Sequence, residues 1–549
     1  MLAILDTMSS TTQLAQEDGR AEKNGLSSVT AQSHDDDGVQ VREVKGVLWF
    51  LVVVAVLSAT FLYALDNTVM ANVRPSIVET FDRIDMLPWL SVSYPMGEVG
   101  ANPLWGKLNN YFNNKVLYLA AILIFEVGSV VIGSAQNIGA VVVGRVIAGL
   151  GGSGIYVGTM NILSAMTVPA ERNQYLTFVG MAWSLGTILG PVIGGAFADS
   201  AATWRWAFYI NICIAAVTTP VCIWLIPPVL PSQSHGLLER LKKIDYLGAV
   251  LFLGGVASIV MVLGFGGAVY DWRSGQMIGL YVATVVIWAA FCFQQGFSLL
   301  TVDRIFPVHL VSDRLMVSMF FWSSIAIANI VVTVYSLPLF FQFTFGDSSL
   351  RSAVYTLPFV ISTIVLAAII SPFFSKFPIY MLWFAGASAV MLIGGGLLST
   401  IDYNTSRATI CGYTVVQGVG LAPVIQLAYT VAQAKVQRST VPEVTAFLSC
   451  AQMAGLALSL GIATSVFLNG ATADIAKILP GVTHDLIQRT IDGAKTGLIQ
   501  DLEPGIRQQV LEAIARNVGK VFYLNVAGSA LGFVMALLMK RERLVLAPQ

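Results

Sequence analysis

Long apolar segments restrict what this chain can fold into more than any other feature of its sequence. About fourteen of them approach the roughly 20 apolar residues that a helix needs to cross about 30 Å of hydrocarbon. Burial in a soluble core would not require so many such blocks, so they predict an all-α polytopic membrane protein. The predicted spans are 47–69, 86–106, 116–135, 139–160, 175–198, 205–226, 246–267, 277–298, 317–342, 353–374, 379–399, 408–433, 444–468 and 520–539.

The composition agrees with lipid as the solvent. Hydrophobic residues make up 56% of the 549 residues and charged residues only 11%, whereas a soluble domain carries about a quarter charged residues. The formal net charge is zero, so no nucleic acid or other strongly charged partner is implied. The five cysteines lie in apolar segments without a CxxC pair, which indicates buried side chains rather than a metal site. We expect no cofactor.

The distribution of basic residues predicts the orientation. An even number of spans places both termini on one side, and the excess of Lys and Arg in alternate loops marks that side as the cytosol. Residues 1–45 are polar, lack the apolar core of a signal peptide and predict a disordered cytosolic tail. The predicted cytosolic positions are Lys107, Lys115, Arg172, Arg240, Lys242, Lys243, Arg304, Arg314, Lys376, Lys435, Arg438, Lys540, Arg541 and Arg543. The opposite loops contain Arg74, Arg83, Arg205, Arg273, Arg351 and Arg407.

Two features fall on the predicted extracytosolic side. Residues 470–519 form the long loop, whose amphipathic pattern predicts short helices over the mouth of the bundle. These helices would be either a structural cover or a gate for substrate. Asn404-Thr405-Ser406 is an N-x-[ST] sequon, so Asn404 is a candidate glycosylation site in a eukaryotic host.

Four ionisable residues lie inside the first four spans: Asp66, Glu98, Glu126 and Arg145. A charged side chain at the centre of a bilayer costs at least ~2.5 kcal/mol, so such residues usually face the bundle interior and pair with one another or serve transport. Asp66 and Arg145 lie at similar depths, which predicts an ion pair. The pair would be either static or a proton-coupling site, where protonation of Asp66 loosens its hold on Arg145. Glu98 and Glu126 are further candidates for proton coupling.

The loop after the second span, Gly106-Lys107-Leu108-Asn109-Asn110-Tyr111-Phe112-Asn113-Asn114-Lys115, resembles the loop 2–3 signature of the major facilitator superfamily, G-x-L-a-D-r-x-G-r-[RK]. Asn110 stands where the family has Asp, and Asn113 where it has Gly. The resemblance implies a latch between the halves of the transporter, and an uncharged Asn110 implies a weakened one. We therefore expect that the substitution Asn110→Asp would not reduce transport. The positions that fit the pattern are Gly106, Leu108, Phe112 and Lys115.

The fourth and fifth spans are rich in glycine. Gly144–Gly154 resembles the superfamily's R-x-x-x-G-x-G-x-G motif, whose arginine, here Arg145, is tied to proton coupling. In the fifth span Gly186, Gly190 and Gly194 are four residues apart, so they share one helix face on which another helix can approach closely. Pro191 between them should add a kink. Together with Gly195, this pattern resembles the antiporter signature of drug-exporting members.

Two further stretches support the same resemblance. Leu65–Pro75 is similar to the l-D-x-T-v-x-N-v-x-P signature of drug:proton antiporters, with Arg74 where Ala is usual, and Trp204–Asn211 is similar to the family's entry into the sixth span. With fourteen spans, the chain resembles the fourteen-helix drug:proton antiporter branch, particularly fungal toxin and multidrug efflux pumps. The resemblance covers about residues 46–540 and is most specific in the first six spans.

The resemblance implies a major facilitator fold of two six-helix bundles with two extra helices between them. The expected parts are 46–227 for the first bundle, 228–300 for a cytosolic loop and the extra helices, 301–469 for five helices of the second, the loop 470–519, and 520–549 for the last helix and tail. Buried amides in the second half indicate interhelical contacts or substrate ligands, and aromatic residues could wall a cavity. The amides are Asn329, Gln342, Gln417, Gln426 and Gln452; the aromatics are Tyr63, Trp183, Phe321, Trp322 and Tyr335.

The expected function is export of small hydrophobic compounds, such as toxins, secondary metabolites or drugs, in exchange for protons. No Walker A sequence, HExxH or nucleophile elbow is present, so neither an ATP motor nor an enzyme is expected. The alternatives are an importer of siderophores or other small molecules on the same fold, and a non-transporting sensor. We expect a monomer in the plasma membrane, with a vacuolar or vesicle membrane as the alternative.

Overall fold

The computed structural model describes residues 44–81, 86–198, 200–228, 236–266, 270–301, 303–347, 349–482, 486–487, 491 and 502–544. Residues 1–43 of the predicted tail and most of the middle of the predicted long loop lie outside these ranges.

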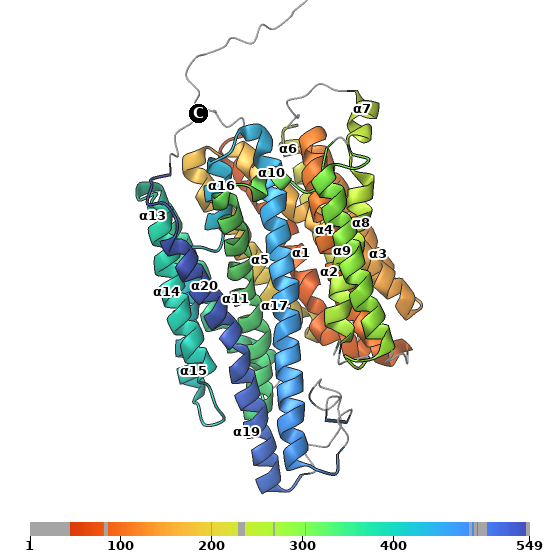
Figure 1. Cartoon of the computed structure of the whole chain (residues 1–549), viewed down its shortest axis with the longest axis vertical. Coiled ribbons are helices and arrows are strands. Elements are labelled where there is room, and N and C mark those ends of the chain that lie inside the picture. The colour runs from red at the N-terminus through yellow and green to blue at the C-terminus, as the bar shows by residue number, and fades with distance from the viewer. Residues whose placement is uncertain are drawn as a thin grey trace, which may run out of the picture. The chain divides into compact units, whose positions relative to one another are not determined.

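Helices make up most of the described chain (Figure 1). The N-terminal helices are α1 (Gly46–Phe81), α2 (Leu87–Tyr111), α3 (Asn114–Gly133), α4 (Ile138–Met166), α5 (Pro169–Ala198) and α6 (Trp206–Leu225). The middle of the chain forms α7 (Leu237–Lys242), α8 (Tyr246–Phe265), α9 (Gly275–Phe297) and α10 (Val308–Val311). The C-terminal helices are α11 (Arg314–Phe345), α12 (Ser349–Val354), α13 (Leu357–Lys376), α14 (Tyr380–Ser399), α15 (Arg407–Leu421), α16 (Leu427–Ala434), α17 (Val441–Ile478), α19 (Pro504–Val521) and α20 (Tyr523–Leu537).

Twelve helical segments of the described chain are long and apolar enough to cross a membrane. The other two predicted spans fall on α2 and on the pair α15 and α16. Helix α2 has the length, but Glu98, Asn102 and Lys107 make it less apolar. The span 408–433 is broken into α15 and α16, because Pro423 in the turn between them lacks a backbone N–H. The all-helical membrane fold predicted from the sequence is therefore confirmed.

Polar residues at the ends of the apolar runs determine where several helices begin. The side chain of Asn137 accepts a hydrogen bond from the backbone of Ala140 at the start of α4. Ser274 and Ser406 cap α9 and α15 in the same way. Such caps satisfy backbone N–H groups that have no partner inside the helix, so they fix the boundaries of spans that hydropathy places only approximately.

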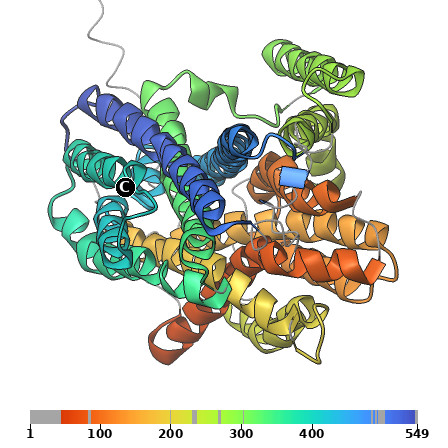
Figure 2. The same cartoon turned by 90° about the horizontal axis from the view of Figure 1, so that it is seen from below.

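The N-terminal helices pack closely: α1 lies along α5, and α4 lies between α2 and α3. Among the C-terminal helices, α11 packs on α17, and α14 packs on α15 and α20. Helix α2 contacts α17, so the two groups of helices meet along this pair (Figure 2). Helix α8 packs on α2, and α9 packs on α8. The side chains of α9 are largely exposed, as expected for a helix that faces lipid.

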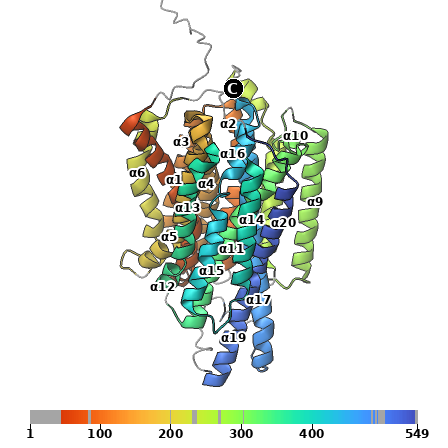
Figure 3. The same cartoon turned by 90° about the vertical axis from the view of Figure 1, so that its left-hand side faces the viewer.

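The predicted long loop at 470–519 is shorter than expected. Helix α17 continues to Ile478 and α19 begins at Pro504, and these two extensions lie side by side at the end remote from α7 and α10 (Figures 1 and 3). Ile475, Val510 and Ile514 are buried between them. The segments with the amphipathic pattern are therefore helical. They continue the neighbouring spans instead of lying across the bundle, because their apolar faces cover each other.

Candidate functional site

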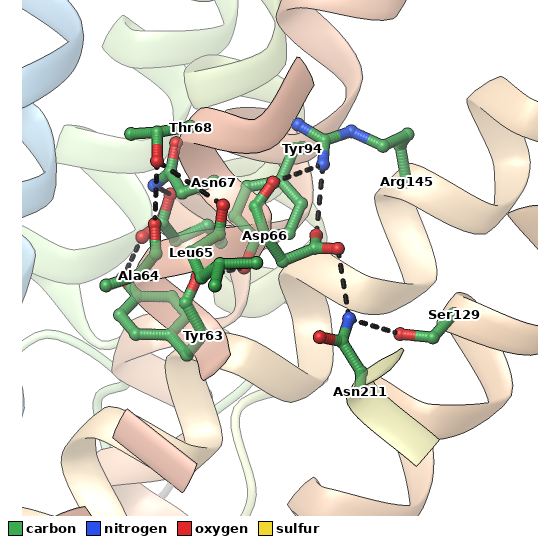
Figure 4. Close-up of polar contacts among 11 residues, drawn as sticks. Tyr63, Ala64, Leu65, Asp66, Asn67, Thr68, Tyr94, Ser129, Arg145 and Asn211 are labelled. Atoms are coloured by element: carbon green, nitrogen blue, oxygen red, sulfur yellow. Dashed lines mark hydrogen bonds and ion pairs between the residues drawn. The ribbon is translucent and has the colours of Figure 1, made fainter. Parts of the chain in front are cut away.

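An ion pair joins α1 to α4 inside the N-terminal helices, as the sequence predicts (Figure 4). Arg145 Nη1 lies 3.0 Å from Asp66 Oδ2 and donates a second hydrogen bond of 2.8 Å to the backbone carbonyl of Asp66. The side chains of Asp66 and Arg145 are 0% and 2% exposed, respectively, so water does not screen the pair. One nitrogen of the guanidinium thus bonds both the carboxylate and the backbone carbonyl of Asp66 on α1.

Three neutral neighbours, which the sequence did not reveal, surround this ion pair: Asn211, Ser129 and Tyr94. Asn211 on α6 donates to Asp66 Oδ1 at 3.3 Å and to Ser129 Oγ at 3.1 Å. The Arg145 guanidinium lies 4.3 Å from the centre of the Tyr94 ring, which favours the cation electrostatically. Asn211 belongs to the stretch that resembles the family's sixth span, but nothing in its sequence context reveals that it faces Asp66.

Glu98 lies on α2, close to this pair but not in contact with it through any hydrogen bond of the described residues. The Tyr63 hydroxyl donates to Glu98 Oε1, and Asn67 Nδ2 donates to Glu98 Oε2 at 3.3 Å. The Tyr94 hydroxyl, whose ring supports Arg145, donates to the Tyr63 carbonyl at 3.3 Å. Glu98 is completely buried. The contacts of Tyr63 and Tyr94 connect it to the ion pair.

Glu126 stands apart from these contacts. It lies half-buried on α3, and its Oε2 atom has no hydrogen-bond partner among the described residues. Of the four predicted proton-coupling residues, the structure thus pairs Asp66 with Arg145, connects Glu98 to them, and leaves Glu126 outside their hydrogen bonds.

The glycine face of α5 lies directly against α1. A Cβ atom on Gly194 would lie 2.7 Å from the Val69 carbonyl oxygen, and one on Gly190 would lie 2.8 Å from the Leu65 carbonyl oxygen. Gly186 makes a similarly close approach one turn earlier. The predicted close packing is therefore present, and its partner is the segment of α1 that carries Asp66. Pro191 and Gly195 lie within α5, which continues through both.

The loop 2–3 motif holds α2 against α17. Asn110 Nδ2 donates to Glu443 Oε1 at 2.8 Å, and Lys107 Nζ lies 3.0 Å from the same oxygen. A Cβ atom on Gly106 would collide with the side chain of Ala446. We call the contact of Asn110 and Lys107 with Glu443 the α2–α17 latch. Because Asn110 donates to a carboxylate here, Asn110→Asp would place a like charge opposite Glu443, and the expectation that this substitution is harmless is revised.

The second departure from the motif also has a structural reason. Asn113, at the position of the family's Gly, caps α3 by accepting a hydrogen bond of 2.9 Å from the backbone N–H of Lys115. Lys115 therefore lies in the first turn of α3. Its side chain is half-exposed at the helix end.

A small pocket lies where the N-terminal and C-terminal helices meet. Its wall comes from α4 and α5 on one side and from α11, the turn before α16, and α17 on the other. Of the aromatics predicted to wall a cavity, Trp183 lines it, whereas Phe321 is 46% exposed and Trp322 packs against Phe384. Among the predicted amides, Gln426 and Gln452 line it, while Gln417 instead bonds Asn329 at 2.7 Å.

The pocket and Glu98 share one side chain. The Tyr63 hydroxyl, which bonds Glu98, also lies 3.3 Å from Sδ of Met453 in the pocket wall. The Tyr63 ring lies 5.9 Å from the ring of Tyr156, another wall residue. A buried carboxylate is thus separated from the pocket by a single tyrosine.

The predicted sequon lies on the surface. Asn404 is exposed in the turn between α14 and α15, where its backbone N–H donates to Asp402 Oδ1 at 3.1 Å. The chain therefore presents this asparagine outside the packed helices.

Taken together, the fold and the buried charges are those of a polytopic membrane protein with ionisable groups between its helices. Residues 56–460 match the model of the Major Facilitator Superfamily. The chain belongs to this superfamily, and is accordingly a membrane transporter and not an enzyme.

Proteins of filamentous fungi are similar over nearly the whole chain. The "MFS-type transporter pgmG" of Aspergillus terreus is 38% identical, over 98% of this chain and 96% of its own. The "Phomenoic acid biosynthesis cluster MFS-type transporter" of Leptosphaeria maculans is 36% identical, over 94% and 85%. The "Efflux pump patC" of Aspergillus clavatus is also 36% identical, over 90% of each chain.

A solved structure supports the fold. The human organic anion transporter MFSD10 superposes with a TM-score of 0.57 at 14% identity, over 89% of this chain and 99% of its own. At this identity the likeness concerns the fold alone.

Proposed function

We propose that this protein exports small hydrophobic compounds across the plasma membrane in exchange for protons. The observation that carries the proposal is the buried Asp66–Arg145 ion pair, because an ionisable pair inside a membrane bundle is costly and usually functional. Export is supported by relatives of similar length that are described as efflux pumps. The antiporter glycines of α5 support the same direction.

Protonation of Asp66 is the proposed step that links the proton to movement. A neutral Asp66 holds Arg145 less tightly, and breaking a buried pair by removing one partner costs about 3–5 kcal/mol. A population shift from 1:99 to 99:1 needs about 5.5 kcal/mol. The loss of the pair is therefore of the right size to drive most of a conformational change.

The glycine face of α5 would allow α1 to move during this conformational change. Asp66 lies between Leu65 and Val69, the residues whose carbonyl groups contact the glycines of α5. Because α5 carries no side chains at these three positions, α1 would slide or rotate on it with little repacking. The N-terminal and C-terminal helices would then rock about the pocket between them, as the two halves of such transporters do.

Glu98 supplies a second proton site beside the compound. Because Tyr63 bonds Glu98 and touches Met453 of the pocket wall, a bound compound that displaces Met453 also disturbs the hydrogen bond to Glu98. Compound binding and proton binding would compete through this tyrosine, as exchange requires. Glu126, with its unpaired oxygen, would accept protons as they enter the bundle.

Accumulation in cells tests the proposal. Cells expressing the protein should retain less of a panel of small hydrophobic fluorescent compounds than cells without it, and a protonophore should remove the difference. Asp66→Asn and Arg145→Ala should each abolish export while the protein still reaches the membrane. Normal export by both variants would contradict the proton-coupling role.

A further inference from the structure

The pocket between the two groups of helices coincides with a break in a membrane span. Helix α15 ends at Leu421 and α16 begins at Leu427, and the turn between them brings Ile425 and Gln426 to the pocket wall. Broken membrane helices are tolerated where they line a cavity, and they often mark binding sites in transporters. The cavity at this break measures about 10 Å³, room for about one water, so a larger compound would enter it only where the two groups of helices move apart.

The wall offers no charge to a compound. All the described residues that line the pocket are neutral, from Tyr156 and Gly180 on one side to Ile330 and Met453 on the other. An ion without a partner is costly to bury in such surroundings, so the wall discriminates against charged compounds.

Two polar atoms of the wall have no hydrogen-bond partner in the described structure: Trp183 Nε1, a donor, and Gln426 Oε1, an acceptor. Their residues are 4% and 3% exposed. A buried polar atom left unpaired costs about 1–3 kcal/mol. A compound that bonds both would remove this cost, whereas an entirely apolar compound would not.

The neighbouring hydrogen bonds indicate which end of Gln426 is free. Its Nε2 donates to the Tyr156 hydroxyl at 3.0 Å, and that hydroxyl donates to Gln452 Oε1 at 2.8 Å. The same Gln452 oxygen accepts from the Tyr429 hydroxyl at 3.0 Å. In this assignment both hydroxyls donate to Gln452, and Gln426 presents its oxygen as the free acceptor. Gly180 gives it room, since a Cβ there would lie 3.0 Å from Gln426 Cγ.

We infer that the exported compounds are neutral and carry a hydrogen-bond acceptor, such as a carbonyl, for the Trp183 indole N–H and a hydroxyl donor for Gln426. That the compounds are exported rests on the proposed function. The binding itself depends neither on protons nor on the direction of transport. Trp183 and Gln426 then determine specificity: the indole N–H selects a carbonyl, and the amide oxygen distinguishes an alcohol from its ether.

Binding of three flavones of similar size to the purified protein in lipid nanodiscs tests this inference. The probes are 7-hydroxyflavone, 7-methoxyflavone and an anionic flavone carboxylate, used at a pH at which the phenol is neutral. One hydrogen bond contributes about 1–1.5 kcal/mol, or roughly tenfold in affinity. We expect the hydroxyl compound to bind roughly tenfold more tightly than the ether, and the anion not to bind.

The variants assign the contacts. Gln426→Leu should weaken 7-hydroxyflavone about tenfold and leave 7-methoxyflavone unchanged, whereas Trp183→Phe should weaken both about tenfold because both carry the carbonyl. Gln417→Leu, the same change at a buried position outside the pocket, should alter neither affinity. The inference is wrong if the wild type binds none of the neutral probes, if the anion binds equally well, or if both pocket variants bind normally. A failure of proton-driven export would leave these affinities untouched.

Discussion

Replacing Asn110 with Asp should open the α2–α17 latch. The Asn110 amide nitrogen lies 2.8 Å from Glu443 Oε1, so the substitution would place two carboxylates side by side. Like charges about 4 Å apart repel by roughly 4 kcal/mol at an effective dielectric constant of about 20. Lys107, 3.0 Å from the same Glu443 oxygen, offsets part of this repulsion. We expect a net loss of about 2 kcal/mol, which corresponds to roughly 30-fold in the population of the closed latch.

Cys450 reports on the latch. It is 5% exposed and lines a small pocket behind Glu443, together with Gly106 and Lys107. With the other four cysteines replaced by alanine, Asn110→Asp should raise the rate at which a water-soluble maleimide modifies Cys450 by about tenfold or more. Unchanged modification would refute the reasoning.

A double variant provides the matched control. Asn110→Asp combined with Glu443→Gln exchanges the carboxylate and the amide across the latch, so one charge again faces Lys107. The modification rate of Cys450 should return close to that of the parent, and the coupling between the two substitutions measures their direct interaction. If the double variant is as open as the single one, the repulsion is not the cause.

Three other predictions follow from the contacts above. Gly190→Leu should stop export without preventing membrane insertion, because its side chain would meet Thr68 and force α1 from α5; export assays should show no loss for Gly386→Leu, whose Cβ meets nothing within 4 Å. Glu98→Gln should preserve probe binding in nanodiscs but weaken the dependence of export on the pH gradient, since an amide cannot exchange a proton whereas Asp66 still can. Glycosidase treatment should shift the protein on a gel, and Asn404→Gln should remove the shift; no shift in the parent, expressed in a eukaryotic host, would contradict the predicted side of this loop.

Features that depend on local sequence were predictable. The spans follow from hydropathy, the shared face of Gly186, Gly190 and Gly194 follows from the helical period, and the cost of burying charge brings Asp66 and Arg145 together. Even the extension of α17 and α19 was visible as an amphipathic pattern, although that pattern could not say which apolar face would cover which.

Features that depend on a distant partner were not predictable. Asn110 looks like a weakened charge until Glu443 of α17, 333 positions away, is seen opposite it. Asn211 and Tyr94 are ordinary residues of their helices until Asp66 and Arg145 are placed beside them. A sequence shows which side chains need partners, but the partner is chosen by the packing of helices far apart in the chain.

Proton movement in proteoliposomes tests the central claim most directly. With the purified protein in liposomes that contain a pH-sensitive dye, a gradient of an exported compound should drive proton movement in the opposite direction. Asp66→Asn should abolish that movement. Proton movement of normal size in Asp66→Asn, or transport of the compound by the parent with no accompanying proton, would contradict the account.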